Sequence, residues 1–420
     1  MAISRTLKFN GILKRYTDGI SQWKALPRTK PNCMNHAVLL TGSTGSLGVY
    51  LLNILLDDPS IGKIYCLNRS QDAERNQMRS HQERILRTWR VDDDRVEFLH
   101  AVFGDEQLGL PDTMYCKLLN TVDVIIHNAW DVNVNRSSTS FQPLIKGTRD
   151  LLDISTQGRF RPHFFFVSSI GTIQNWVLSM GGPSAPEDLI EASGAFLNQG
   201  YAESKHIAER ICYHVSTMVG VPTTILRVGQ IAGPSYREGN WNTSEWLPAL
   251  VATSRSLGKI PKSLGNAERI NWIPVDMVAD IIEEIMHNRL EEQEQSISAC
   301  LHLVNPHTST WQDLLHSIQS KYNLTIVDFT EWIQELELIK NPTMQDMQSK
   351  PGLKLLSFYR DLINADGTSS QIDVSKAKRA STTLTALQPI SADMMENWLR
   401  QWEELGNDCD QSRINANGLS

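Results

Sequence analysis

A tyrosine and a lysine four residues apart, Tyr201 and Lys205 in the run YAESK, have the types and spacing to do chemistry together. On a helix, side chains at this spacing project from the same face, one turn apart. A lysine ammonium near the phenol would lower the proton affinity of the phenol, and the phenol would deliver a proton to a carbonyl oxygen that receives hydride. An ordinary surface helix would also explain the pair.

The run FVSSIG ends a predicted strand upstream of this helix and supplies a hydroxyl group. Ser169 would hydrogen-bond a substrate carbonyl and help to polarise it, with Ser168 as the alternative, although either hydroxyl could merely satisfy a loop. Ligands of parallel α/β sheets bind at the ends of strands. We therefore predict Ser169, Tyr201 and Lys205 as the catalytic set of a carbonyl-reducing site.

Three glycines at intervals of three lie between the apolar run HAVLL and the helical run LLNILL. Gly42, Gly45 and Gly48 permit a tight turn, close approach of a pyrophosphate, and close packing of a helix on a strand. The free N–H groups and positive dipole end of that helix would face the phosphates. The predicted cofactor contacts from this turn are Thr41, Gly42, Thr44, Gly45, Ser46, Leu47 and Gly48.

Arg69 follows the second predicted strand, where an NAD-specific site commonly carries an acid for the ribose hydroxyl. Its guanidinium suits a 2′-phosphate instead, and Arg79 would supply a second positive charge. The alternative is that both belong to a solvated, arginine-rich face over residues 69–90. We predict NADP(H) as the cofactor. Asp105, Asn128 and Ala129 follow later strands and would border the adenine and ribose, although such residues also favour turns.

Apolar, strand-like runs alternate with helical stretches through residues 35–234, which predicts a Rossmann-type doubly wound parallel sheet in an α/β fold. Amphipathic pieces over 235–420 predict a smaller, mainly helical substrate-binding subdomain, with about 268–306 returning to the sheet. Residues 1–34 are predicted to be a linker or docking segment. The predicted strands are HAVLL, KIYCLN, RVEFLHAVFGD, VDVIIHNA, HFFFVSS, TTILRVG and CLHLVNP.

The overall composition points to no macromolecular ligand. A net charge of −7 and a pI near 5.9 argue against general attraction to nucleic acid or an anionic membrane. Six scattered cysteines suggest neither a metal site nor a disulfide framework, and reduced thiols fit the cytoplasm. The sequence shows no run near the roughly 20 apolar residues of a membrane span and no signal peptide at its start.

In this order, TGSTGSLG, FVSSIG and YAESK resemble the extended short-chain dehydrogenase/reductase superfamily. VIIHNAWDVN, GYAESKHIAERI, LRVGQIAGP, GNWNTSEWLP and INWIPVDMVA resemble more specifically the thioester reductase domains of fungal adenylation-thiolation-reductase enzymes, of carboxylic acid reductase type, and of polyketide synthases. This resemblance implies that NADPH reduces an acyl thioester on a phosphopantetheine arm. Ser169 and Tyr201 would stabilise or protonate the oxyanion, and aldehyde and thiol would be released. A second hydride would give the alcohol.

The resemblance extends these expectations to the acyl and nicotinamide sides of the site. Arg227 to Gln230 should line the nicotinamide side, with Val228 and Gln230 as cofactor contacts. Trp241 and Trp246 would border the acyl channel, although tryptophans at such spacings usually fill a core.

Two segments depart from the family pattern. LIKGT, at 144–148, stands where related domains often have an asparagine, which leaves that cofactor contact open. The segment 175–196, between Ser169 and Tyr201, is long and would form a loop that gates the substrate.

We expect an excised terminal domain that is monomeric in isolation and receives its substrate from a carrier domain of the same multidomain enzyme. Two alternatives stay open: an extended reductase acting on a free carbonyl or nucleotide sugar, and a redox-silent cyclising release domain. The presence of both Tyr201 and Lys205 argues against the second.

Overall fold

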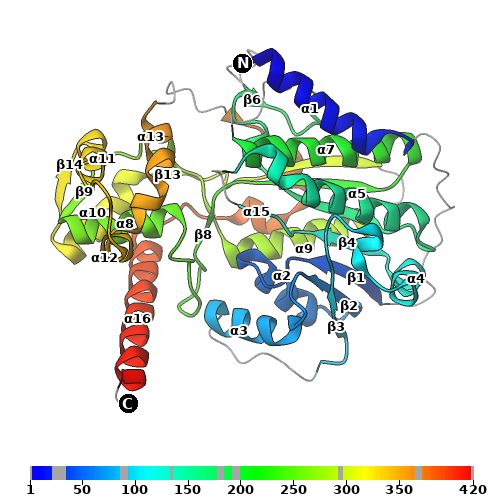
Figure 1. The fold of residues 1–420 in the computed structure, drawn as a ribbon, viewed down its shortest axis with the longest axis horizontal. Helices are drawn as coiled ribbons and strands as arrows, with labels where there is room; N and C mark the ends of the chain where they lie inside the picture. The colour runs from blue at the N-terminus through cyan, green and yellow to red at the C-terminus, as the bar shows by residue number, and fades with distance from the viewer. Residues whose placement is uncertain are drawn as a thin grey trace.

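A seven-stranded parallel sheet forms the centre of the molecule (Figure 1). In spatial order its strands are β12 (Ser298–Leu303), β7 (Thr223–Val228), β5 (His163–Ser169), β4 (Val124–His127), β1 (His36–Thr41), β2 (Ile61–Asn68) and β3 (Val96–His100). Strand order reverses between β1 and β4, the point at which doubly wound sheets bind ligands. The predicted Rossmann-type fold is confirmed. The structure is a computed structural model that describes residues 2–20, 35–85, 93–132, 136–176, 184–191, 199–291, 297–364 and 371–417.

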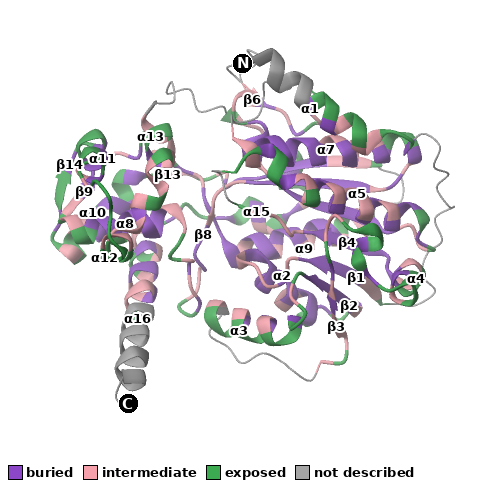
Figure 2. Cartoon of the chain, in the orientation of Figure 1, coloured by how far each residue is buried: buried purple, intermediate pink, exposed green. Residues whose placement is uncertain are grey.

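Helices cover both faces of this sheet, and the strands between them are buried (Figure 2). These helices include α2 (Ser46–Asp57) and α9 (Val275–Glu291) on one face, and α5 (Gln142–Gln157) and α7 (Gly200–Val219) on the other. Along β1, Val38 and Leu40 belong to the first apolar layer and Leu39 to the second, as the alternation of a strand requires. Within the described ranges, the structure holds no helix long and apolar enough to cross a membrane.

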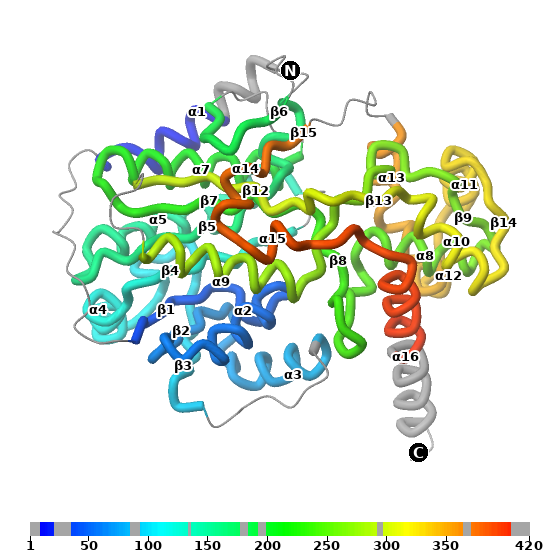
Figure 3. The backbone as a smooth tube through the Cα atoms, turned by 180° about the vertical axis from the view of Figure 1, so that it is seen from behind, coloured from blue at the N-terminus to red at the C-terminus, as the bar shows by residue number. Residues whose placement is uncertain are grey.

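A second, mainly helical lobe stands beside the sheet (Figure 1). Its helices include α8 (Trp246–Leu257), α10 (Trp311–Tyr322), α11 (Phe329–Glu337), α13 (Leu356–Asn364) and α16 (Ala392–Asn417). Its core is built around Trp311, Trp332 and Trp398, which are fully buried. Seen from behind, α14 (Ser375–Ala380) and α15 (Thr382–Ala386) run along α9 before the chain enters α16 (Figure 3). The chain therefore crosses between the lobes more than once.

The segment predicted as a linker contains a packed helix. Helix α1 (Ala2–Thr17) lies on α7 and buries Phe9 and Ile12 in the apolar layer beneath it. The Arg149 guanidinium donates to the backbone carbonyl of Tyr16 at 2.7 Å and fixes the end of the helix. This helix is part of the sheet lobe.

An ion-paired histidine joins α9 to the end of α2. His287 Nε2 lies 3.0 Å from Glu283 Oε1 and 2.8 Å from Asp58 Oδ2. The hydrogen bond with Glu283, with help from Asp58, outweighs partial burial and raises the pKa of His287 to about 9. A histidine whose pKa is higher in the folded than in the unfolded chain stabilises the fold fully below its unfolded value and loses this contribution as pH rises through its folded value.

We therefore expect the free energy of unfolding to fall by about 1–2 kcal/mol between about pH 6.5 and pH 9.5, after a reduction for the partial exposure of the imidazole. Urea unfolding at both pH values would measure this change. His287→Gln should remove most of it. An equally steep pH dependence in that variant would contradict the assignment.

Candidate active site

The glycine turn after β1 forms a cradle without side chains. Gly42 has a left-handed φ of +72°, and a Cβ on Gly48 would lie 1.9 Å from the carbonyl oxygen of Gly42. Gly45 is the N-cap of α2 and offers no side-chain cap. The first N–H groups of α2 therefore lack helical partners and face outward, which is the arrangement that binds phosphates. These residues fit the pyrophosphate of a dinucleotide.

A hydrogen-bond relay ties this turn to the loop after β4. Thr148 Oγ1 donates to the backbone carbonyl one turn earlier, so it accepts from His127 Nε2 at 3.0 Å. Thr41 Oγ1 then donates to His127 Nδ1 at 2.9 Å and accepts from the backbone N–H groups of Asn128 and Ala129 at 3.1 and 2.9 Å. Burial lowers the pKa of His127 well below its usual value, so the imidazole is neutral. Thr148 thus anchors the segment that lacks the expected asparagine.

Ser169 and Tyr201 meet at the carboxyl end of β5. A hydrogen bond joins their side chains; burial raises the pKa of Tyr201 to about 12, and Ser169 lowers it in part. Ser169 Oγ also accepts from the N–H of Gly171 at 3.1 Å. The alternative, Ser168, is buried and donates to Glu209 Oε1 at 2.5 Å. Ser169 is therefore the hydroxyl beside the phenol.

Lys205 lies in a buried cage one turn further along α7. Its Nζ donates to the carbonyl oxygen of Val167 at 2.5 Å. The same atom lies 4.3 Å from the ring centre of Trp130 and 4.8 Å from that of Phe166. Aromatic faces at this range favour the charged ammonium, and they hold its position at the end of β5.

Burial lowers the pKa of Lys205 to about 7, and the carboxylate of Glu209 raises it in part. The pKa of Tyr201 is raised by burial and lowered in part by Ser169. An effect of Lys205 on the proton affinity of the phenol stays a prediction.

A buried ion pair lies behind the Ser169–Tyr201 pair. The guanidinium of Arg227 donates to both carboxylate oxygens of Glu209, with the shortest distance 2.8 Å, and both side chains are fully buried. Glu209 also accepts from Thr172 Oγ1 at 3.0 Å. The prediction that Arg227 lines the nicotinamide side is wrong, because its side chain is buried against α7.

Val228 and Gln230, which follow Arg227 in the chain, have different surroundings from it and from each other. Val228 is buried in the apolar layer that contains α2. Gln230 accepts from the indole N–H of Trp246 at 2.8 Å, so it links the end of β7 to the helical lobe.

Trp241, which was predicted to border the acyl channel, is 3% exposed and packs on Trp398 with ring centres 4.9 Å apart. Trp241 thus fills the core of that lobe and does not border a channel.

The two arginines predicted to bind the 2′-phosphate are both exposed. Arg69 directly follows β2 and has no hydrogen bond or ion pair within the described part of the chain. Arg79 lies on α3 (Ala73–Ile85), 3.8 Å from Glu83 Oε1. Asp105 is also exposed, and its backbone carbonyl accepts from Lys146 at 3.0 Å. Residues 177–183 and 192–198, which include most of the predicted gate, lie outside the described residues.

A third arginine, which was not predicted from the sequence, lies at the glycine turn. Arg84 Nη1 donates to Ser46 Oγ, the first helical residue of α2, at 2.8 Å. The backbone carbonyl of Arg84 accepts from Tyr50 Oη at 3.2 Å and from the N–H of Asn240 at 2.9 Å. Arg84 belongs to the arginine-rich stretch 69–90. Its contact with Ser46 depends on the packing of α3 against α2, which is a tertiary contact.

This chain is similar to a known protein family and to two known reductases. Residues 40–282, more than half of the chain, match the family described as male sterility protein. The carboxylic acid reductase of Neurospora crassa is 34% identical over 399 residues, which cover 93% of this chain and 37% of that protein. Adenylate-forming reductase Nps9 of Serpula lacrymans is 33% identical over 393 residues, which cover 87% of this chain and 34% of that protein. The chain thus spans about a third of the length of these relatives.

A solved structure shares the fold over almost the whole chain. The terminal R domain from the myxalamid PKS-NRPS biosynthetic pathway superposes with a TM-score of 0.76 at 23% identity, covering 94% of this chain and 97% of that one. The family match includes the glycine turn and the positions of Ser169, Tyr201 and Lys205. The chain belongs to the male sterility protein family of NAD-binding domains.

Proposed function

We propose that the chain is an NADPH-dependent reductase that releases the acyl group of a carrier-bound thioester as an aldehyde. The observation that carries the proposal is the hydrogen-bonded Ser169–Tyr201 pair, with Lys205 beside it, at the same edge of the sheet as the glycine turn. The similarity to a carboxylic acid reductase and an adenylate-forming reductase supports it.

The residues present fit the cofactor. The turn at 42–48 would hold the pyrophosphate, and Arg69 with Arg79 would hold the 2′-phosphate. Bound NADPH would supply the hydride that adds to the thioester carbonyl carbon. Lys205 is placed one turn from Tyr201, where its ammonium would contact the nicotinamide ribose.

The side chains of the chain then act on the carbonyl oxygen. Tyr201 keeps its proton at neutral pH because its pKa is about 12, so it is a proton donor suited to reduction. Ser169 would hydrogen-bond the same oxygen as its charge develops. Collapse of the resulting hemithioacetal breaks the C–S bond and releases the aldehyde and the carrier thiol. A second round of reduction would give the alcohol.

Arg69→Ala should raise the KM for NADPH by about 10- to 100-fold, because a charge-assisted contact with phosphate contributes about 1.5–3 kcal/mol. The KM for NADH, which lacks the 2′-phosphate, should stay nearly constant. Arg75→Ala, which removes an exposed arginine of α3, is the matched control. Equal changes for both cofactors would contradict the assignment of Arg69 to the phosphate.

The function is tested with a panel of acyl-pantetheine and acyl-carrier substrates, by measuring NADPH oxidation and product masses together. The expected result is one aldehyde for each NADPH consumed. Turnover of a free carbonyl or nucleotide sugar without any thioester reduction would favour the extended-reductase alternative. A cyclised product without NADPH oxidation would favour a redox-silent release domain.

A further inference from the structure

Trp130 lies in the loop after β4 and contacts α7 between Tyr201 and Lys205. Its indole N–H donates to Ser204 Oγ at 3.2 Å, and that hydroxyl donates to the backbone carbonyl of Tyr201 at 2.7 Å. The ring centre of the same indole lies 4.3 Å from Lys205 Nζ. One side chain therefore contacts the helix turn that carries Tyr201 and also covers the ammonium of Lys205.

Trp130 is itself held in place by the sheet. Its ring packs edge-on against Phe166 and His127, with ring centres 5.7 and 5.9 Å apart. The backbone before it is fixed because the N–H of Ala129 donates to Thr41 Oγ1 at 2.9 Å. Contacts from β1, β4 and β5 thus position the indole against α7.

The ammonium of Lys205 is buried with few polar partners. Lys205 is 2% exposed, and within the described residues its one hydrogen bond goes to the carbonyl oxygen of Val167. An ammonium has three N–H donors, and burial is costly where donors lack acceptors. The rings of Trp130 and Phe166 offset this cost by cation–π attraction, which is strongest for tryptophan. The other two N–H groups stay available for a ribose hydroxyl.

The charged and titratable groups around Lys205 do not replace the rings. Burial lowers the pKa of Lys205 to about 7, and Glu209 and Cys212 on α7 raise it in part. His127 faces it from β4 as a neutral imidazole, because burial and the charge of Lys205 hold the pKa of His127 well below its usual value. Arg227 of β7 is paired with Glu209. In the described part of the chain, no carboxylate lies within ion-pair distance of Lys205.

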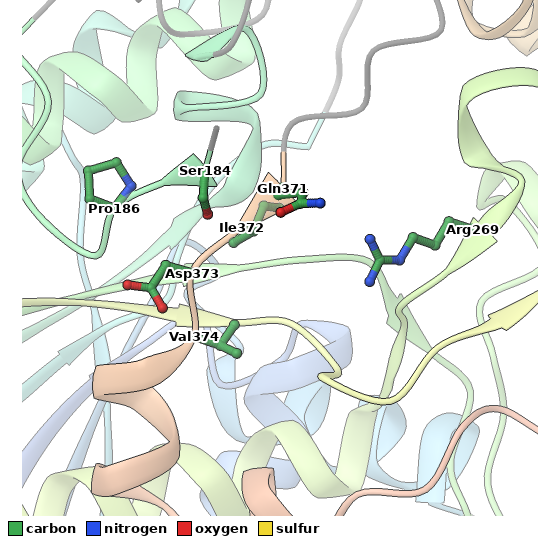
Figure 4. Close-up of a pocket in the computed structure, with 7 residues that line it drawn as sticks. All are labelled: Ser184, Pro186, Arg269, Gln371, Ile372, Asp373 and Val374. Carbon is green, nitrogen blue, oxygen red and sulfur yellow. The ribbon is translucent and has the colours of Figure 1, made fainter. Parts of the chain in front are cut away.

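The surroundings of Lys205 are separate from the cavity shown in Figure 4, which borders β6 (Ser184–Ala185) and β15 (Gln371–Ile372). The walls of that cavity include Arg269 and Asp373, and neither Trp130 nor Lys205 is among its lining residues. A substitution of Trp130 therefore leaves those walls unchanged.

We infer that Trp130 is a positioning residue for the reduction: its ring keeps the Lys205 ammonium charged and in place at the end of β5. The inference rests on the proposed function, in which this ammonium contacts the nicotinamide ribose. Trp130 acts through Lys205 and needs no contact with the reacting atoms.

The test follows kcat/KM for acyl-pantetheine between about pH 5.5 and pH 9 in the unaltered chain and in Trp130→Leu. Activity should fall on the alkaline side as Lys205 loses its proton. Because the ring favours the charged form, Trp130→Leu should move this fall to lower pH by about one pH unit. Trp130→Phe keeps a ring face and loses the indole N–H, so it should move the fall by less than about half as much.

A double variant separates an action through the lysine from general damage. Trp130→Leu should lower kcat/KM about five- to tenfold near pH 7, but less than about twofold in the background of Lys205→Met, which has no ammonium. Trp402→Leu, which alters a partly exposed tryptophan of the helical lobe, is the matched control and should leave the pH dependence unchanged. The inference is overturned by an alkaline fall that does not move, by equal movement in Trp130→Leu and Trp130→Phe, or by a full loss in the double variant.

Binding of NADPH, followed by its fluorescence, tests the inference without turnover. The Kd of Trp130→Leu should exceed that of the unaltered chain by about five- to tenfold near pH 7, and the two values should converge by about pH 9, where both lysines are neutral. A ratio that stays constant with pH, or equal Kd values throughout, would overturn the inference. If the unaltered chain binds NADPH in this way but reduces no thioester, the proposed function fails and the role of Trp130 stands.

Discussion

Tyr201→Phe is expected to lower kcat for thioester reduction by about 10²- to 10⁴-fold while the affinity for NADPH stays nearly constant. The phenol is buried, hydrogen-bonded to Ser169 and held protonated by a pKa of about 12. Phenylalanine keeps the ring and its packing but removes the proton that the reduced carbonyl oxygen must receive. Steady-state kinetics on acyl-pantetheine, with NADPH binding followed by fluorescence, would measure both effects.

Tyr213→Phe is the matched control, because Tyr213 lies on the same helix and is partly exposed. It should retain near-normal kcat. A loss of less than about threefold in Tyr201→Phe, or a similar loss in both variants, would show that the phenol does not donate the proton.

The second large effect concerns the buried ion pair behind the site. Glu209→Ala should destabilise the fold by about 3–5 kcal/mol, because it leaves the guanidinium of Arg227 buried without a partner. The hydroxyl group of Ser168 loses its acceptor in the same variant. Burial raises the pKa of Glu209, but the charge and hydrogen bonds of Arg227, with smaller contributions from His206 and Ser168, together lower it below its usual value and keep the carboxylate ionised. Chemical denaturation would measure the change in the free energy of unfolding.

Two further variants test whether the loss of stability comes from the unpaired buried charge. The double variant Glu209→Leu with Arg227→Met should recover part of the lost stability, because it leaves no unpaired buried charge. Glu97→Ala removes the carboxylate that pairs with Lys117 and Lys63 at a partly exposed position and should cost at most about 1 kcal/mol. Equal costs for Glu209→Ala and Glu97→Ala would contradict the account.

The sheet could be predicted because its strands are buried on both faces and therefore read as continuous apolar runs, such as VDVIIHNA and HFFFVSS. The glycine turn was also readable, since few residues other than glycine tolerate the conformation of Gly42 or the contact at Gly48. These features depend on neighbours in the chain and on the period of a strand.

The surroundings of the side chains were harder to predict. Val228 and Arg227 are adjacent in β7 and must face opposite sides of the sheet, a signal that would have separated them. The cage around Lys205 comes from Trp130 and Phe166, which only the pairing of β4 and β5 brings together. No local pattern records that contact.

The contacts of residues outside the sheet were equally hard to predict from the sequence. Arg84 reaches Ser46 only because α3 folds back against the start of α2. Tryptophan is a residue type that can line a pocket, but the indole of Trp241 is enclosed by the tryptophans of the helical lobe. Burial of this kind depends on how the lobe packs, which the spacing of the tryptophans does not determine.

The most direct measurement is a single turnover of an acyl-loaded carrier with NADPH that carries deuterium at the transferred position. Mass spectrometry should find an aldehyde with deuterium on its carbonyl carbon, together with free carrier thiol. An acid, a cyclised product or an aldehyde without deuterium would contradict reductive release by the Ser169–Tyr201 pair.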